Sequence, residues 1–224
     1  MKEEFLNTII ESQEKRQAIV YLLNIDNHDE KILYPNEKTG NKELDVKLLE
    51  CIRSDKSMLL NIDNQNYFID IYNPPLKLII IGAVHIAQHL ILFANNLSVD
   101  CILIDPREGF ANAERFPGVK IYNNWPDEVM NDIDIDHRTA IVTLTHDPKI
   151  DDVALRLVLK CECFYIGSLG SRKTHLSRLD RLGLDFNSSD LKRIHGPIGL
   201  NIGARTPVEI ALSIVGEIIS ILRN

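Results

Sequence analysis

The stretch of residues 78–90 constrains the fold of this chain more than any other. Four apolar residues run into Gly82, and apolar side chains then recur at Ile86, Leu90 and Phe93. A continuous apolar run followed by helical spacing is typical of a buried parallel strand that turns into a helix. The sequence therefore predicts a strand-turn-helix unit at the start of a parallel α/β fold.

The turn of this unit matches part of a dinucleotide-binding fingerprint, G-x-G-x-x-G/A. In that motif the first glycine makes a tight turn, the second lets a pyrophosphate approach the backbone, and the third lets the helix pack on the strand. Gly82 and Ala87 fill the first and third places, whereas Val84 stands at the second. We expect the valine side chain to project toward the phosphate position, which argues against NAD(P). The alternative is a turn that packs well and binds nothing.

A carboxylate and a guanidinium follow the second predicted strand. The apolar run over residues 99–104 ends in Asp105. This acid lies about 20 residues past Gly82, where the fingerprint places the carboxylate that binds a ribose hydroxyl. Arg107 follows two residues later, at a position that suits a phosphate.

Predicted strands and helices alternate from Leu76 onward, which indicates a Rossmann-like parallel sheet with helices on both faces. The strands are predicted at 77–82, 99–104, 119–122, 139–144 and 163–167, and the helices at about 85–96, 125–131, 149–160, 171–182 and 206–222. Residues 1–73 instead predict a small α+β N-terminal domain. Asn73-Pro74-Pro75 separates it from a C-terminal domain over residues 76–224, because consecutive prolines cannot join a central strand.

Polar residues follow the predicted strands at the edge where ligands of parallel sheets bind. They are His85 after the first strand, His146 and Asp147 after the fourth, and Ser168, Gly170, Ser171 and Arg172 after the fifth. Ser171 suits the cap of a helix whose free amides and dipole attract an anion. His146 and Asp147 carry groups suited to acid–base chemistry. The alternatives are a capped strand end at Asp147 and a plain helix start with solvated basic residues at Ser171.

A glycine-rich segment over residues 195–207 precedes the last helix. Its glycine-rich backbone, which includes Gly199, and Arg205 suit a phosphate. Thr206 and Glu209 predict a capping box at the start of the helix. The helix is apolar on more than one side, which fits a core position or the contact of a homodimer. The alternative for the segment is a purely structural connection.

Charge and cysteine content exclude several classes of protein. The formal net charge of -7 argues against general nucleic-acid binding. No apolar run approaches the length needed to cross a bilayer, and the first residues lack a signal-peptide pattern, so we expect a cytoplasmic protein without a membrane partner. The cysteines lie mostly in apolar runs and are expected to be reduced thiols. Cys161-Glu162-Cys163 lacks the spacing of a zinc site, so no metal site is expected.

Taken in order, the segments that follow the strands resemble the XdhC/CoxI family of xanthine dehydrogenase accessory factors. The resemblance covers about residues 76–220 and rests on the segments Leu78 to His89, Asp105 to Arg107, Thr145 to Asp152, Tyr165 to Thr174, and Ile194 to Glu209. It implies a Rossmann-like C-terminal domain that binds molybdenum cofactor (molybdopterin). It also implies help with sulfuration of that cofactor and its delivery to molybdenum hydroxylases such as xanthine dehydrogenase. A cofactor sulfurase is a further expected partner.

The resemblance and the turns described above define one set of expected cofactor-binding residues. They are Gly82, Val84, His85, Asp105, Arg107, His146, Asp147, Ser168, Gly170, Ser171, Arg172, Gly199, Asn201 and Arg205. Two positions depart from the family's pattern, since Val84 replaces a glycine and Asn201 replaces an aspartate. Residues 1–75 lack the glycine-rich, cysteine-containing segment of full-length relatives, so no role of that segment is transferred to this chain.

The sequence therefore predicts an accessory protein for molybdenum cofactor, bound as a pterin phosphate or a pterin dinucleotide. It would assist maturation of the cofactor or its insertion into a xanthine dehydrogenase-type hydroxylase. We assign no catalytic residue and prefer a non-catalytic, cofactor-binding chaperone. One alternative is an NAD(P)-dependent oxidoreductase, for which Asp105 favours NAD while Val84 disfavours both nucleotides. Another is a degenerate paralogue that acts only through protein contacts.

Overall fold

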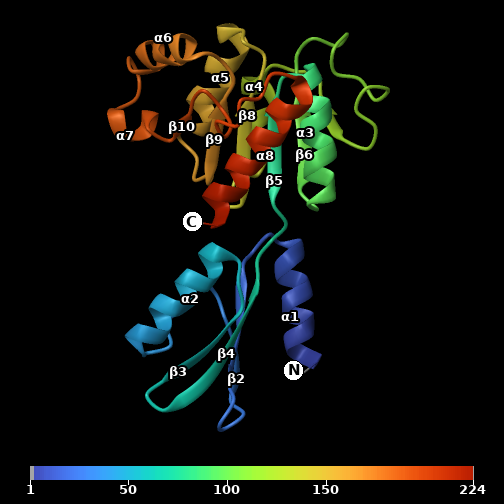
Figure 1. Cartoon of the computed structure of the whole chain (residues 1–224). Helices are drawn as coiled ribbons and strands as arrows, with labels where there is room; N and C mark the ends of the chain where they lie inside the picture. Colours follow the sequence, from blue (N-terminus) through green and yellow to red (C-terminus); the bar gives the residue numbers. More distant parts are fainter. Residues whose placement is uncertain (1–2, 224) are drawn as a thin grey trace. The chain divides into compact units, whose positions relative to one another are not determined.

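The computed structural model describes residues 3–223, which fall into two compact units (Figure 1). The first contains residues 3–75 and 222–223, and the second contains residues 76–221. None of the helices among the described residues is long and apolar enough to cross a membrane.

A six-stranded parallel sheet forms the centre of the second unit. Its strands are β5 (Lys77–Ile81), β6 (Asp100–Ile104), β7 (Lys120–Tyr122), β8 (Thr139–Thr143), β9 (Tyr165–Ser168) and β10 (Ile194–His195). Their order across the sheet is β10-β9-β8-β5-β6-β7, and every neighbouring pair is parallel. This is the strand order of a Rossmann fold. The predicted fold class is therefore confirmed.

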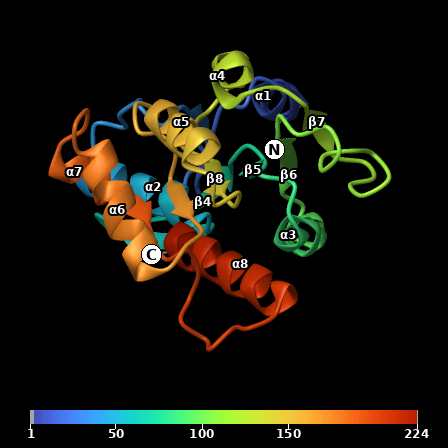
Figure 2. The same ribbon diagram turned by 90° about the horizontal axis from the view of Figure 1, so that it is seen from above.

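Helices cover both faces of this sheet, because successive side chains of a strand point to opposite faces. On β5, Ile80 packs in one apolar cluster with Leu90 and Ile214, whereas Ile79 packs in the other with Leu155. One face is covered by α3 (His85–Asn96) and α8 (Pro207–Arg223). The other is covered by α4 (Pro126–Val129), the 3-10 helix η1 (Met130–Asp132), α5 (Pro148–Val158) and α6 (Arg172–Leu182). Figure 2 shows α3 and α8 on one side of the strands and α4 and α5 on the other.

Two short elements were absent from the sequence prediction. They are α7 (Ser188–Leu191) and β10, which has two residues and pairs with β9. Neither is long enough to show a hydrophobic period. The fifth predicted strand also begins two residues later than expected, because a turn at residues 159–164 follows α5.

The first unit is an antiparallel sheet with two helices. Its elements are α1 (Glu3–Glu14), β1 (Ile19–Asn24), β2 (Glu30–Leu33), α2 (Lys42–Ser54), β3 (Met58–Ile62) and β4 (Gln65–Tyr72), and the strand order is β2-β1-β4-β3. Leu44, Leu48 and Cys51 of α2 are buried in a cluster with Val20 and Ile69 of the sheet. The α+β class expected for this part of the chain is confirmed.

Candidate functional site

The centre of the parallel sheet is a topological switch point. From β5 the chain continues to β6 and β7 on one side, and it then returns to β8, β9 and β10 on the other side. Ligands of such sheets bind beyond the carboxyl ends of the strands at this point. Gly82 follows β5 there with φ of 114°, and a Cβ atom added to it would lie 2.7 Å from Cγ2 of Thr145. Only glycine lets the β5–α3 turn pass so close to the β8–α5 loop.

The amino end of α3 presents free backbone donors beside this turn. The amide of Ala83 donates to Asp105 at 2.7 Å, whereas the amides of residues 84–86 meet no acceptor within residues 3–223. No side chain caps this helix. Exposed amides at a helix start attract anions. The side chain of Val84 is partly buried and packs against the apolar cluster of the α3 face. His85 is exposed.

Asp105 has a different role from the one expected. Its side chain is fully buried, with an exposed fraction of 0%. Its two oxygens accept hydrogen bonds from the Ala83 amide at 2.7 Å, the Arg107 amide at 3.0 Å, and Nε and Nη2 of Arg107 at 2.8 and 2.7 Å. Because both oxygens are occupied, the carboxylate is not available to a ribose hydroxyl. It instead joins the β5–α3 turn to the loop after β6.

Asp105 and Arg107 form an ion pair, and the guanidinium of Arg107 is partly exposed. Burial acts to raise the pKa of Asp105, but the hydrogen bonds from Arg107 and Ala83 outweigh it, so the pKa lies below its ordinary value. The side chain of Arg107 keeps 35% of its surface exposed, and its guanidinium carbon lies 4.4 Å from the ring centre of Phe110. Asp105 therefore fixes a partly exposed guanidinium at the carboxyl edge, with its charge paired to the carboxylate.

The β8–α5 loop is held by a buried carboxylate. Asp151 is 1% exposed and accepts hydrogen bonds from Thr145 Oγ1 at 2.6 Å, the Thr145 amide at 3.3 Å and the His146 amide at 3.1 Å. His146 adopts the left-handed conformation with φ of 62°, and its side chain is exposed. Asp147 caps α5 by accepting the Lys149 amide at 2.9 Å. The loop thus presents the imidazole of His146 to solvent from a conformation that non-glycine residues seldom adopt.

The β9–α6 turn confirms one expectation and corrects another. Ser171 caps α6, since its Oγ accepts the Thr174 amide at 3.1 Å. Gly170 has φ of 152°, and Arg172 is exposed. Ser168, however, is fully buried and bonds to the Thr143 hydroxyl of β8. Its side chain joins two strands and does not face a ligand.

The glycine-rich loop before α8 encloses a hollow of about 360 Å³. Its lining includes Leu169, Arg172, Gly199, Asn201 and Ile210. The predicted capping box is confirmed, because a Glu209 oxygen accepts the Thr206 amide at 2.8 Å and the Glu209 amide donates to Thr206 at 3.3 Å. The same carboxylate oxygen accepts the Arg205 amide at 2.7 Å, and the Arg205 side chain is exposed.

Glu217 of α8 anchors this loop to the sheet. It accepts the Gly199 amide at 2.9 Å and the Tyr165 hydroxyl, and its other oxygen lies 4.0 Å from Nδ1 of His195. The rings of Tyr165 and His195 are stacked with centres 4.9 Å apart. Burial and the carboxylate raise the pKa of Tyr165, so it stays a hydrogen-bond donor.

The structure thus arranges the predicted residues in two groups at the carboxyl edge. The first surrounds the switch point and contains Gly82, Val84, His85, Asp105, Arg107, His146 and Asp147. The second surrounds the β9–α6 turn and the loop before α8 and contains Ser168, Gly170, Ser171, Arg172, Gly199, Asn201 and Arg205.

Three residues of the edge were not among the expected site residues: Asp151, Arg178 and Glu217. A signal for the first was present, because Asp151 falls on the buried stripe of α5 with Ala154, Leu155 and Val158. A charged residue within an apolar stripe indicates a buried polar contact.

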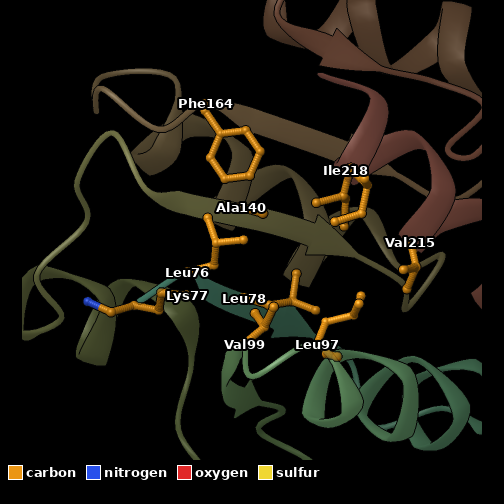
Figure 3. A pocket seen from close by; sticks show the side chains of 11 residues that line it. Leu76, Lys77, Leu78, Leu97, Val99, Ala140, Phe164, Val215 and Ile218 are labelled. Carbon is orange, nitrogen blue, oxygen red and sulfur yellow. The ribbon is translucent and has the colours of Figure 1, made fainter. Parts of the chain in front are cut away.

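A further cavity lies at the opposite end of the sheet. Figure 3 shows its lining side chains, among them Leu78 of β5, Ala140 of β8, Phe164 and Ile218. It measures about 20 Å³, about the space of one water molecule. It is too small for a cofactor and lies away from the carboxyl edge. Among residues 3–223 no group of three or more His, Cys, Asp or Glu side chains is placed to hold a metal ion.

The cysteines in the described part of the chain are free thiols. Burial raises the pKa of Cys101 to about 12 and that of Cys163 to about 11. Thiols of this kind are chemically inert at neutral pH.

Comparison with known proteins adds a family match and several relatives. The family described as "XdhC Rossmann domain" matches residues 78–218. A Bacillus subtilis (strain 168) protein, named as a probable subunit of xanthine dehydrogenase, is 27% identical over 206 residues, which are 91% of this chain and 60% of that protein. The Escherichia coli (strain K12) "Molybdenum cofactor insertion chaperone PaoD" is 32% identical over 102 residues, which are 45% of this chain and 31% of that protein.

A solved structure shares the fold. It is a crystal structure described as a xanthine dehydrogenase from Bacillus halodurans, with a TM-score of 0.73 and 24% sequence identity. The similarity covers 98% of this chain and 67% of that one. The present chain spans only 60% and 31% of the length of the two curated relatives above.

Proposed function

Because the chain belongs to the XdhC family, we propose that it is an accessory protein that binds molybdenum cofactor as a pterin phosphate or pterin dinucleotide. In this proposal it assists maturation of the cofactor or its insertion into a xanthine dehydrogenase-type hydroxylase in the cytoplasm. The names of the Bacillus subtilis and Escherichia coli relatives support a role connected with molybdenum enzymes. A cofactor sulfurase and a second copy of the chain are further predicted partners.

One observation carries the proposal: the constrained conformation of His146 at the switch point. A left-handed non-glycine residue costs about 1–3 kcal/mol and persists only where the surrounding structure holds it, as at ligand clamps and switch regions. Here the buried carboxylate of Asp151 holds the residue in place. The imidazole stands on the loop that packs against the β5–α3 turn.

The charges beside His146 suit an anionic ligand. The free amides of residues 84–86 and the positive end of α3 attract a phosphate, and Arg107 adds a guanidinium that Asp105 fixes in place. Phosphate groups are the anionic parts of a pterin phosphate and of a pterin dinucleotide. We therefore assign the phosphate to the α3 amides and contact with the rest of the ligand to His146.

The geometry disfavours an NAD-dependent oxidoreductase. Both oxygens of Asp105 are occupied by Ala83 and Arg107, so the acid cannot recognise a ribose hydroxyl without losing these bonds. Titration with NAD and NADP separates the two functions. Tight binding of either nucleotide by the unmodified chain would favour the enzyme instead.

The test of the proposal is equilibrium binding of molybdopterin to the purified chain. Saturable binding should raise the melting temperature, because a ligand that binds only the native state stabilises it by mass action. Inorganic phosphate at high concentration should compete with the cofactor. A folded preparation without saturable binding would contradict the proposal and would favour a protein that acts through protein contacts alone.

A further inference from the structure

Arg178 is a buried cation with unsatisfied donors. Its side chain is 2% exposed, and Nη2 donates to the carbonyl oxygen of Leu169 at 2.9 Å. Nε and Nη1 have no hydrogen-bond partner among residues 3–223. A buried guanidinium with two free donors is costly, and native proteins normally give such groups a partner.

The nearest carboxylates do not supply that partner. Asp151 and Asp152 both act on Arg178 through their charge. Asp152, however, forms two hydrogen bonds with Arg181, at 2.5 and 3.0 Å. Asp151 accepts its three bonds from the β8–α5 loop. Nε and Nη1 of Arg178 therefore have no carboxylate partner among residues 3–223, and the buried charge is left for an anion near it.

Arg178 lies directly beneath the β9–α6 turn. Besides its bond to Leu169, Nη2 would lie 3.7 Å from a Cβ atom added to Gly170, and the same Cβ would lie 3.1 Å from Thr174. Because Gly170 has no side chain, the guanidinium lies close to the backbone of the turn. The Nδ1 atom of His175, on the same helix, is also buried without a partner among the described residues.

The turn above Arg178 presents free amides. Ser171 Oγ accepts the Thr174 amide, and the Ser171 carbonyl accepts the His175 amide at 2.9 Å. The amides of residues 170–173 donate to no acceptor in the described part of the chain. This turn opens a helix of 11 residues, so the positive end of the helix dipole adds to the field of Arg178.

We propose that the β9–α6 turn is a second anion subsite that binds a phosphate group through the amides of residues 170–173, with Arg178 as its buried counter-charge. This rests on the proposed function for the identity of the whole ligand. Two strand spacings, about 10 Å, separate β9 from β5 within the sheet, and α6 and α3 lie on opposite faces, so the subsite lies more than about 10 Å from the α3 amides. The two sites therefore suit a ligand with two separated anionic groups.

The experiment is a titration of the full chain with inorganic phosphate, followed by the backbone amide signals in nuclear magnetic resonance. Saturable shifts are expected at residues 170–173. Arg178→Met should weaken this binding by at least about tenfold, since the field of a buried positive charge is lost. Arg178→Lys should retain part of it. The matched control is Arg181→Met, which removes the same charge from the same helix and should leave the affinity within about twofold.

The outcomes separate this subsite from the proposed function. Shifts confined to residues 84–86 would overturn the subsite and leave the α3 site in place. Equal loss of affinity in Arg178→Met and Arg181→Met would also overturn it. If Arg178→Met does not fold, the unmodified chain and Arg178→Lys still decide the question. Saturable shifts at residues 170–173 without molybdopterin binding would support the subsite and contradict the proposed function.

Discussion

The carboxylate of Asp151 accepts the backbone amide of His146 at 3.1 Å, and that residue holds φ of 62°. One buried acid thus fixes the only left-handed non-glycine residue described at the carboxyl edge. This hydrogen bond holds the backbone of His146 in its strained conformation, so that the imidazole keeps one position at the switch point. It also makes the role of His146 testable, because strain and function can be separated by substitution.

His146→Gly should stabilise the fold and weaken ligand binding. Glycine relieves a left-handed strain of about 1–2 kcal/mol and costs about 0.5–1 kcal/mol in unfolded-state entropy, so the free energy of unfolding should rise by up to about 1.5 kcal/mol. Urea unfolding measures this change, and titration with molybdopterin measures the loss of affinity.

His28 provides a matched control for this variant. It is also exposed and left-handed, with φ of 61°, but lies in the first unit. His28→Gly should give a similar gain in stability with unchanged affinity. Equal affinity of the two variants for the cofactor would remove His146 from the binding site.

Gly82→Ala should destabilise the chain more than the same change at another left-handed glycine. The new Cβ would lie 2.7 Å from Thr145 Cγ2, so strain and overpacking together should cost about 2–4 kcal/mol. Gly118 has φ of 75° and nothing within 4 Å of an added Cβ, so Gly118→Ala should cost only about 1 kcal/mol. Thermal unfolding measures both.

Thr145→Ser offers a rescue of Gly82→Ala. Serine removes the Cγ2 methyl but keeps the hydroxyl that donates to Asp151. The double variant should therefore recover part of the lost stability. If the losses of stability from the two substitutions simply add in the double variant, the close approach of the two loops is not the cause of the loss in Gly82→Ala.

The ion pair of Asp105 and Arg107 predicts that the free energy of unfolding falls at acidic pH. The pKa of Asp105 is lower in the folded chain than its ordinary value of 3.8. The unfolded chain therefore takes up the proton first as the pH falls. The stabilisation by Asp105 is complete above about pH 4 and is lost as the pH falls through the folded pKa.

Asp105→Asn should remove this pH dependence. At neutral pH the free energy of unfolding of the variant should be about 2 kcal/mol below that of the unmodified chain, because Arg107 then keeps only weaker hydrogen bonds. This difference between the two proteins should shrink below about pH 4. Asp180→Asn, at an exposed position of α6, is the control and should follow the unmodified chain. Denaturant unfolding at several pH values measures the gap, and a constant gap would contradict the role of Asp105.

The sheet could be predicted from sequence because its strands are short apolar runs that end at polar residues. Ile79, Ile80 and Ile81 are all fully buried, as a strand covered on both faces requires. The position of Asp105 at a strand end was also predictable. Its partners were not, because the bond to Ala83 depends on how two loops meet in the folded chain. The burial of Arg178 was not predicted for the same reason. Helical spacing does not show which basic side chain of α6 lies buried beneath the β9–α6 turn.

Glu217 should control the order of the loop before α8. It accepts the Gly199 amide at 2.9 Å and the Tyr165 hydroxyl, and no other carboxylate within residues 3–223 bonds to either group. Glu217→Ala should leave both donors without this acceptor and speed hydrogen exchange of the Gly199 amide by about tenfold or more. Glu217→Gln keeps one acceptor oxygen and should exchange at an intermediate rate. The Ser171 cap of α6 does not contact Glu217, so the Thr174 amide serves as the internal reference and should exchange equally in all three proteins. If the Gly199 amide also exchanges equally in all three, the loop is held by its packing on Ser213 and Ile214 and not by the carboxylate.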